Sequence, residues 1–147
     1  MNNLYTIGFT QKTAEKFFDL LKESNVKTVL DIRLNNTSQL AGFAKFPDLQ
    51  YFLKKIYDIE YIHDTNFAPT ESTLKRFKNK EIDWDGYVQE FTHTMNSRKI
   101  ENYIAENYTN YDNICLLCSE PTAEKCHRRL IAEIFQNHYS NLKIRHL

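Results

Sequence analysis

The sequence predicts a single three-layer α/β domain over residues 1–147, with a mainly parallel sheet of about five strands flanked by helices. Short apolar runs typical of buried strands alternate along the chain with segments of helical periodicity. Helices that connect successive strands require the strands to run parallel, with helices covering both faces of the sheet. A length of 147 residues, 41% of them hydrophobic, suits one core rather than two.

In the first half of the chain, strand and helix patterns alternate regularly. Thr13 can cap a helix whose apolar residues recur at helical spacing, and Pro47 suits the first turn of another. A polar loop over residues 34–39 separates the second strand from that second helix. The expected order is strand 4–7, helix from 14, strand 26–32, helix from 47 and strand 59–63.

The second half continues the alternation with more helix. A small basic helix follows the break at Pro69, and Asp83 can cap a helix that places Trp84 and Phe91 on its inner side. The apolar run 114–117 is typical of a buried strand. The expected order is helix 72–80, helix from 84, helix from 100, strand 114–117, helix to about residue 138 and strand 142–147.

Charge and composition exclude several classes of function. Lys plus Arg and Asp plus Glu each number 19, so the formal net charge is zero, which argues against a bulk electrostatic grip on nucleic acid or on an anionic membrane. No apolar run approaches the roughly 18 residues of a membrane span, and the N-terminus lacks signal-peptide anatomy. Three cysteines, an odd number, fit a reducing compartment. A cytoplasmic protein is therefore expected, with no membrane partner and with its oligomeric state left open.

Polar residues follow the predicted strands at their carboxyl ends. Residues 8–10 follow the first strand, 31–35 end the second, 63–64 end the third, and 118–120 follow the strand at 114–117. The carboxyl ends of parallel strands share one edge of the sheet, and the crevice there is the usual ligand site of α/β proteins. We therefore expect these four segments to converge on a single site.

Cys118 and His127 supply the reactive groups of this site. Cys118 ends a strand close to the N-terminus of the next helix, and His127 lies on the apolar stripe of that helix in its first turn. A helix N-terminus and a nearby histidine both lower a thiol pKa, which suits a nucleophile with His127 as general base and Glu120 as the partner of His127. Cys118, Glu120 and His127 are the predicted catalytic residues. The alternative is a buried free thiol beside a core histidine that is hydrogen-bonded to a carboxylate.

Two arginines indicate an anionic ligand. Arg128 lies in the first turn of a helix, where a cation is unfavourable unless an anion or a carboxylate is close. Arg33 offers a bidentate fork to a phosphate or carboxylate, with Asp31 to orient it or act as a base, although the pair could equally form an internal salt bridge. The predicted substrate-binding residues are Gly8, Thr10, Asp31, Arg33, Asn35 and Arg128.

The cysteines also raise the question of a metal. Cys115 and Cys118 have metal-ligand spacing, and Cys126 with His127 would complete four ligands. Strand residues three apart point to opposite faces, however, and Cys115 sits in an apolar run typical of the core. No metal ligand is therefore predicted, and structural zinc remains an alternative. With three glycines and no Gly-rich phosphate loop, no cofactor is expected.

Four short stretches resemble the motifs of a known family. Thr6-Ile7-Gly8, Asp31-Ile32-Arg33, Cys118-Ser119-Glu120 and Cys126-His127-Arg128 resemble those of the widespread bacterial and archaeal domain-of-unknown-function 488 family. The Cys-x-Glu with Cys-His-Arg is the specific part of the resemblance, which extends over the whole chain. The family's Thr-Ile-Gly is usually followed by His-Ser, where this chain has Phe9-Thr10. The resemblance implies kinship and names no reaction.

These observations favour a small enzyme that acts on a nucleotide or another phosphate-bearing molecule, as a thiol-dependent or acid–base hydrolase or transferase. The alternative from another class is a non-catalytic binding module, structural or associated with nucleic acid, in which the Cys-His-Arg residues form a buried polar network. The basic run 75–80 beside Trp84 could serve nucleic acid, but the acidic residues around it favour a solvated helix face.

Overall fold

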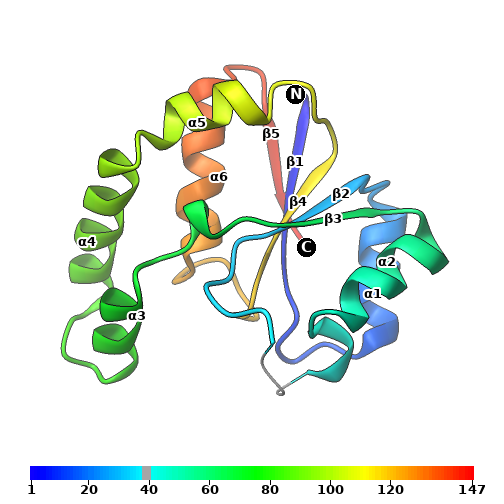
Figure 1. Cartoon of the computed structure of the whole chain (residues 1–147), viewed down its shortest axis with the longest axis horizontal. Helices are drawn as coiled ribbons and strands as arrows, with labels where there is room; N and C mark the ends of the chain where they lie inside the picture. Colours follow the sequence, from blue (N-terminus) through cyan, green and yellow to red (C-terminus); the bar gives the residue numbers. More distant parts are fainter. Residues whose placement is uncertain (38–40) are drawn as a thin grey trace.

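The computed structural model describes residues 1–37 and 41–147. Its centre is a sheet of five strands, all parallel, in the order β3-β2-β4-β1-β5 (Figure 1). The strands are β1 Asn3–Gly8, β2 Thr28–Asp31, β3 Glu60–His63, β4 Ile114–Cys118 and β5 Lys143–His146. The three-layer α/β fold expected from the sequence is therefore confirmed, and the sheet is parallel throughout.

Helices cover the two faces of the sheet in separate layers (Figure 1). One face packs against α1 and α2, and the other against α4, α5 and α6, with α3 beside α4. The helices are α1 Ala14–Glu23, α2 Asp48–Tyr57, α3 Glu71–Lys78, α4 Trp84–Ser97, α5 Ile100–Asn107 and α6 His127–His138, with short 3-10 turns η1 Gly42–Ala44 and η2 Thr65–Phe67. Each layer buries its own apolar cluster against the sheet, as the helical stripes predicted.

Alternation along β4 assigns its side chains to the two cores. All five residues of β4 are buried. Ile114 and Leu116 belong to the core under α4, α5 and α6, whereas Cys115 and Leu117 belong to the core under α1 and α2. Cys115 is thus a core residue, as its apolar neighbours predicted.

Two helices start where the sequence predicted, because capping hydrogen bonds determine their first turns. The Thr13 side chain accepts a hydrogen bond from the Lys16 amide, and Asp83 accepts one from the Gly86 amide, so both predicted caps are confirmed. The expected bounds need small corrections. The basic helix begins after a cap at Thr70 rather than at residue 72, and the second and fifth strands are shorter than predicted, although Ile32 and Leu147 still donate to Leu117 and Thr6 of the neighbouring strands. The polar loop expected at 34–39 lies outside the described residues from 38 onward.

The order of the strands creates a crevice position at the carboxyl end of β4. After β1 the chain crosses β4 to reach β2, whereas after β4 it crosses β1 to reach β5, so the connections leave in opposite directions. Such a switch point is where open α/β sheets bind ligands. The segments after β1 and β4 are joined there by the Thr10 amide, which donates to the Ser119 carbonyl at 3.1 Å.

No helix among the described residues has the length and apolar character needed to cross a bilayer.

Candidate functional site

Cys118 and His127 meet at the switch point. Cys118 is the last residue of β4, His127 is the first residue of α6, and both are buried, at 5% and 7% exposure. The Cys118 Sγ lies 3.5 Å from His127 Nδ1, while His127 Nε2 lies 2.9 Å from the Ile32 carbonyl oxygen. A carbonyl only accepts, so Nε2 carries a proton and Nδ1 faces the sulfur. The pair can therefore exist as thiol with imidazole or as thiolate with imidazolium.

The surroundings of Cys118 favour the thiolate. A hydrogen bond from the Cys126 thiol is the largest influence that lowers the pKa of Cys118. Burial opposes it, while the Ser119 and Glu120 amides and the positive charge of Arg128 lower the pKa further. The pKa of Cys126 is raised, first by this same hydrogen bond and then by burial, so Cys126 remains the neutral donor.

Cys115 provides the contrast within the same strand. Its side chain is fully buried on the opposite face of the sheet, and burial raises the pKa of its thiol. It is therefore expected to be inert, and only one end of β4 carries a reactive thiol.

Arg128 is a buried cation. Its side chain is 1% exposed, and its guanidinium donates to the carbonyls of Glu120 and Pro121, to the Thr6 hydroxyl at 3.3 Å and to the Cys126 sulfur at 3.7 Å. Among the described residues no Asp or Glu lies within ion-pair distance of it. A buried charge is costly unless it is balanced, and a Cys118 thiolate supplies the opposite charge nearby. Arg128 thus holds the loop after β4 and favours the anion on Cys118.

Gly8 is required by a close approach of two backbones. It pairs with Cys118 in the ladder between β1 and β4. A Cβ at this position would lie 1.7 Å from the Glu120 carbonyl oxygen and 2.8 Å from Arg128 Nη1. The sequence assigned Gly8 to close contact with a ligand, whereas the structure shows that the close contact is with the loop that carries Glu120.

Asp31 and Arg33 form an internal ion pair, which was the alternative left open by the sequence. The Asp31 carboxylate accepts from Arg33 Nε at 2.8 Å and Nη2 at 2.6 Å, and Tyr61 donates to it at 2.7 Å. Arg33 Nη2 also donates to the Ala44 carbonyl, and both charged groups are buried. The guanidinium stacks over Phe9 at 5.1 Å. Of the three guanidinium nitrogens of Arg33, Nε and Nη2 have hydrogen-bond acceptors, and Nη1 has none among the described residues. Little of this fork is therefore available to a ligand.

The other predicted site residues lie around this centre rather than in it. Thr10 and Glu120 are exposed, and Asn35 is exposed with its side-chain oxygen accepting from the Thr37 amide and hydroxyl at 2.9 and 2.8 Å. The expected Glu120–His127 pair is not formed, because both ring nitrogens of His127 face other partners. Glu120 contributes its backbone instead, through its amide to Cys118 and its carbonyl to Arg128.

A known protein family matches most of the chain. The sequence model of the family described as "Domain of unknown function DUF488" matches residues 13–135. The chain belongs to the DUF488 family. Comparisons with curated proteins and with solved structures gave no match. In this DUF488 chain Cys118, Cys126, His127 and Arg128 lie inside the matched stretch, whereas Gly8 precedes it.

Sequence reasoning missed three groups around Arg128. The Thr6 hydroxyl accepts from Arg128 Nε and lies 2.7 Å from His146 Nδ1, within hydrogen-bond distance. Lys12, in the turn after β1, has its pKa lowered by partial burial and then by the positive charges of Arg128 and Lys16. A polar residue inside an otherwise apolar first strand was the available indication for Thr6. His146 and Lys12 gave none, because their proximity depends on the strand order.

Three potential metal ligands also converge. The ligand atoms of Cys118, Cys126 and His127 lie within 4.8 Å of one another, and the bond from His127 Nε2 to a carbonyl is a usual outer contact of a metal-binding histidine. Cys115, the fourth ligand of the zinc alternative, points into the opposite core. Two thiolates would neutralise a divalent ion and leave Arg128 unbalanced, which favours a metal-free thiolate.

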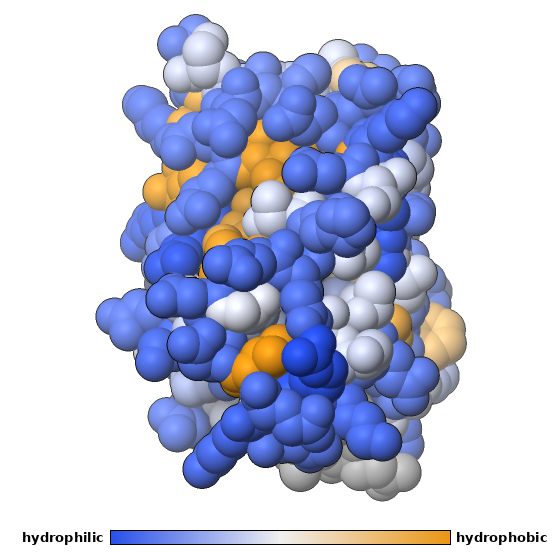
Figure 2. All heavy atoms as spheres, turned by 90° about the vertical axis from the view of Figure 1, so that its left-hand side faces the viewer, coloured by the Kyte–Doolittle hydropathy of each residue, from blue (hydrophilic) through white to orange (hydrophobic). Residues whose placement is uncertain are grey.

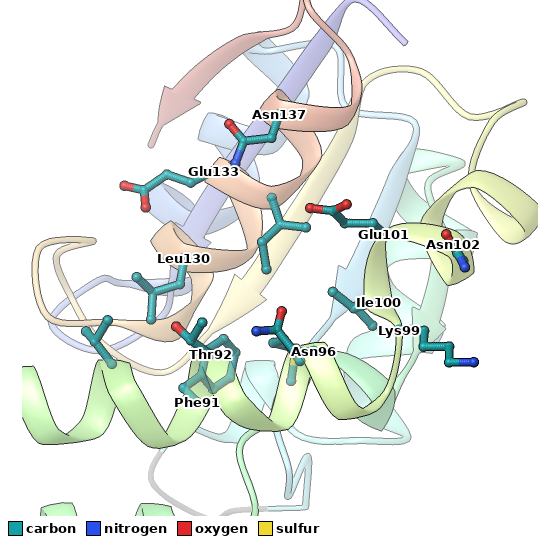
Figure 3. Close-up of a pocket in the computed structure, with 13 residues that line it drawn as sticks. Phe91, Thr92, Asn96, Lys99, Ile100, Glu101, Asn102, Leu130, Glu133 and Asn137 are labelled. Atoms are coloured by element: carbon teal, nitrogen blue, oxygen red, sulfur yellow. The ribbon is translucent and has the colours of Figure 1, made fainter.

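A separate groove lies between α4, α5 and α6, with a volume of about 540 Å³. Seen from the α4 side, hydrophobic atoms emerge in a narrow strip among hydrophilic ones (Figure 2). Phe91, Ile100 and Leu130 line the groove together with the amides of Asn96 and Asn137 (Figure 3). Phe91 connects the groove to the site, because its ring packs against His127 with centroids 5.7 Å apart.

Proposed function

We propose that this DUF488 chain is a cysteine-dependent enzyme that acts on an anionic, phosphate- or carboxylate-bearing substrate at the carboxyl ends of the strands. The observation that carries the proposal is the Cys118–His127 pair, with the sulfur 3.5 Å from Nδ1 and the ring fixed by the Ile32 carbonyl. A nucleophile beside a base that a third group orients is the general arrangement of covalent catalysis.

The pair supports a two-step transfer. The Cys118 thiolate attacks an electrophilic phosphorus or carbonyl carbon, a bond from sulfur to the substrate forms, and the bond to the leaving group breaks. His127 gives its Nδ1 proton to the leaving group. In the second step His127 takes a proton from water or from an acceptor alcohol, which attacks the intermediate and releases the thiolate. Water makes the protein a hydrolase and an alcohol makes it a transferase.

Positive potential around Arg128 supports an anionic substrate. The pKa of Lys12 is lowered by burial and by Arg128, and the pKa of His146 is lowered by burial and then by Arg128 and Arg129. Both neighbours therefore experience the charge of Arg128, which no described carboxylate balances. Positive charge near a crevice raises the local concentration of anionic ligands.

The low exposure of Cys118 restricts the substrate. With 5% of the residue exposed, direct attack requires that the electrophilic atom reach the sulfur through a narrow opening. A terminal phosphoryl or acyl group satisfies this requirement better than a bulky internal linkage.

One observation favours the non-catalytic alternative. The Asp31–Arg33 fork is closed on itself, and two of the four hydrogen bonds of Arg128 go to backbone carbonyls, as in a network that only stabilises the fold. In that case the substitutions would lower stability without altering any ligand effect.

Alkylation kinetics and ligand screening together test the proposal. The rate of iodoacetamide modification against pH should show one reactive thiol with a lowered pKa, which Cys118→Ser abolishes and Cys115→Ala leaves in place. Phosphorylated and carboxylated metabolites should raise the melting temperature of the wild type, and a hit should be turned over by the wild type but not by Cys118→Ser or His127→Gln. A folded Cys118→Ser that retains turnover of such a hit would refute the catalytic role.

A further inference from the structure

Cys126 is a buried thiol that the proposed two-step transfer does not consume. It is 2% exposed, it immediately precedes α6 with extended backbone angles of φ −137° and ψ 137°, and its side chain makes no capping bond to the helix. Its sulfur lies within 4.8 Å of the Cys118 sulfur and 3.7 Å from Arg128 Nη1. Two thiols, one base and one cation thus occupy a single buried pocket.

We propose that Cys118 and Cys126 form a redox-active dithiol that reduces small hydroperoxides, with Cys118 as the attacking thiolate and Cys126 as the resolving thiol. This inference rests on the anionic Cys118 that the proposed function also requires, but it requires no anionic substrate.

The first step oxidises Cys118. Its thiolate attacks the terminal oxygen of the hydroperoxide, a sulfur–oxygen bond forms and the oxygen–oxygen bond breaks. The alkoxide or hydroxide that leaves takes the Nδ1 proton of His127 and departs as an alcohol or water. Cys118 is then a sulfenic acid, and the hydroperoxide has accepted two electrons.

The second step joins the two sulfurs. The Cys126 thiol gives its proton to His127 Nδ1 and attacks the Cys118 sulfur, so that a disulfide forms and the sulfur–oxygen bond breaks. The hydroxide that leaves takes that proton and departs as water. A small-molecule or protein dithiol then returns both cysteines to thiols by exchange.

Oxidation of Cys118 changes the charge in the pocket in the way that the second step requires. In the reduced protein the hydrogen bond to the Cys118 thiolate is the first cause of the raised pKa of Cys126, so Cys126 stays protonated and does not compete as a nucleophile. Sulfenic acid formation removes that negative charge. Arg128, in contact with the Cys126 sulfur, then favours the Cys126 thiolate instead. One cation therefore serves the two thiolates in turn.

Access and geometry are compatible with this chemistry. Hydrogen peroxide is small enough to reach a sulfur with little exposed surface, unlike a bulky substrate. The two sulfurs must approach from within 4.8 Å to a bond of about 2.05 Å. The segment between them, residues 119–125, contains no buried residue, and its part after Pro121, which Arg128 does not hold, can adjust with little disturbance of the core.

Intact mass and peptide mapping after treatment with hydrogen peroxide test the inference. The wild type and Cys115→Ala should each lose two hydrogen atoms, and the peptide map should show Cys118 joined to Cys126. Cys126→Ser should form no disulfide and should instead gain oxygen atoms on Cys118, ending as sulfinic acid. Cys118→Ser should show neither the disulfide nor the added oxygen atoms at this position. A thiol reductant should restore the wild-type mass but not that of the overoxidised Cys126→Ser.

Two results would overturn the inference. One is overoxidation of Cys118 in the wild type at the rate seen in Cys126→Ser, and the other is a disulfide that involves Cys115. Iodoacetamide reactivity of the same samples separates this failure from that of the proposed function. A Cys118 that reacts with iodoacetamide but forms no disulfide would refute the dithiol inference alone. A Cys118 that reacts with neither iodoacetamide nor hydrogen peroxide at neutral pH would refute the inference and the proposed function together. Melting curves confirm that each variant is folded.

Discussion

Replacement of Gly8 by alanine should damage both the fold and the thiolate. The new Cβ would lie 1.7 Å from the Glu120 carbonyl oxygen and 2.7 Å from its carbon, and real Cβ atoms essentially never approach closer than 3.0 Å. The obstructing atoms are backbone, so no side-chain rotation relieves the contact. The Glu120 peptide must therefore move by more than about 1 Å away from β1.

The cost of this movement can be bounded. Overpacking a well-packed interior costs typically 1–3 kcal/mol, and a backbone obstruction belongs at the upper end, so we expect a loss of about 3 kcal/mol in unfolding free energy. For a domain of this size that corresponds to a drop of roughly 6–12 °C in melting temperature. Because the Glu120 amide is one of the groups that lower the pKa of Cys118, the same movement should raise that pKa.

Urea unfolding and the pH profile of iodoacetamide alkylation measure the two effects separately. Gly42→Ala is the matched control, because a Cβ there meets no atom of the described residues within 4 Å and its φ is not in the left-handed region. It should change the unfolding free energy by less than about 0.5 kcal/mol. A Gly8→Ala protein that melts within about 2 °C of the wild type would refute the steric reasoning. A destabilised variant with an unchanged alkylation profile would show that the Glu120 amide does not support the thiolate.

Three further outcomes follow from the charges of the site. Asp31→Asn should cost about 3–5 kcal/mol in urea unfolding, because it leaves the buried Arg33 without its carboxylate; a loss below about 1 kcal/mol would contradict the ion pair. Arg128→Met should raise the pKa of Cys118 in alkylation profiles, whereas Arg129→Met, which alters a partly exposed pair, should not; equal profiles would contradict the role of the buried cation. The folded-state pKa of Cys118 lies below its unfolded value, so between the two the native protein binds fewer protons and its stability rises with pH. That contribution is lost as the pH falls through the folded pKa. Cys118→Ser should remove this rise in the unfolding free energy, measured by urea unfolding from mildly acidic to mildly alkaline pH. If the slope of the unfolding free energy against pH stays unchanged, Cys118 keeps its proton in the native protein.

Much of the fold was predictable because local chemistry determines it. Thr13 and Asp83 cap their helices through hydrogen bonds to residues three positions on, and such short-range bonds can be read from spacing alone. The burial of β4 on both faces likewise follows from an unbroken apolar run. The strand order was not predictable, since nothing in the sequence of β4 states that it lies between β1 and β2.

The convergence of the candidate site residues was predictable, but their contacts were not. Parallel strands bring Cys118, Asp31 and Gly8 to one edge whatever their order, so topology alone predicts that these residues converge. Their partners depend on distances that spacing does not give. His127 bonds to the carbonyl of Ile32, a backbone group with no sequence signature, and this contact replaces the expected Glu120 pair.

The charge balance of the pocket links the proposed reaction to the proposed redox chemistry. Arg128 requires one negative charge, and the reduced site supplies it on Cys118. Alkylation, attack on a substrate or disulfide formation each neutralises that sulfur and leaves the cation unbalanced in a buried position. An anionic group on the substrate would restore the balance during the covalent intermediate, whereas a neutral substrate would not. The same cation that favours the thiolate therefore gives a physical reason for an anionic substrate, and it also predicts that the disulfide form binds inorganic phosphate more tightly than the dithiol form does.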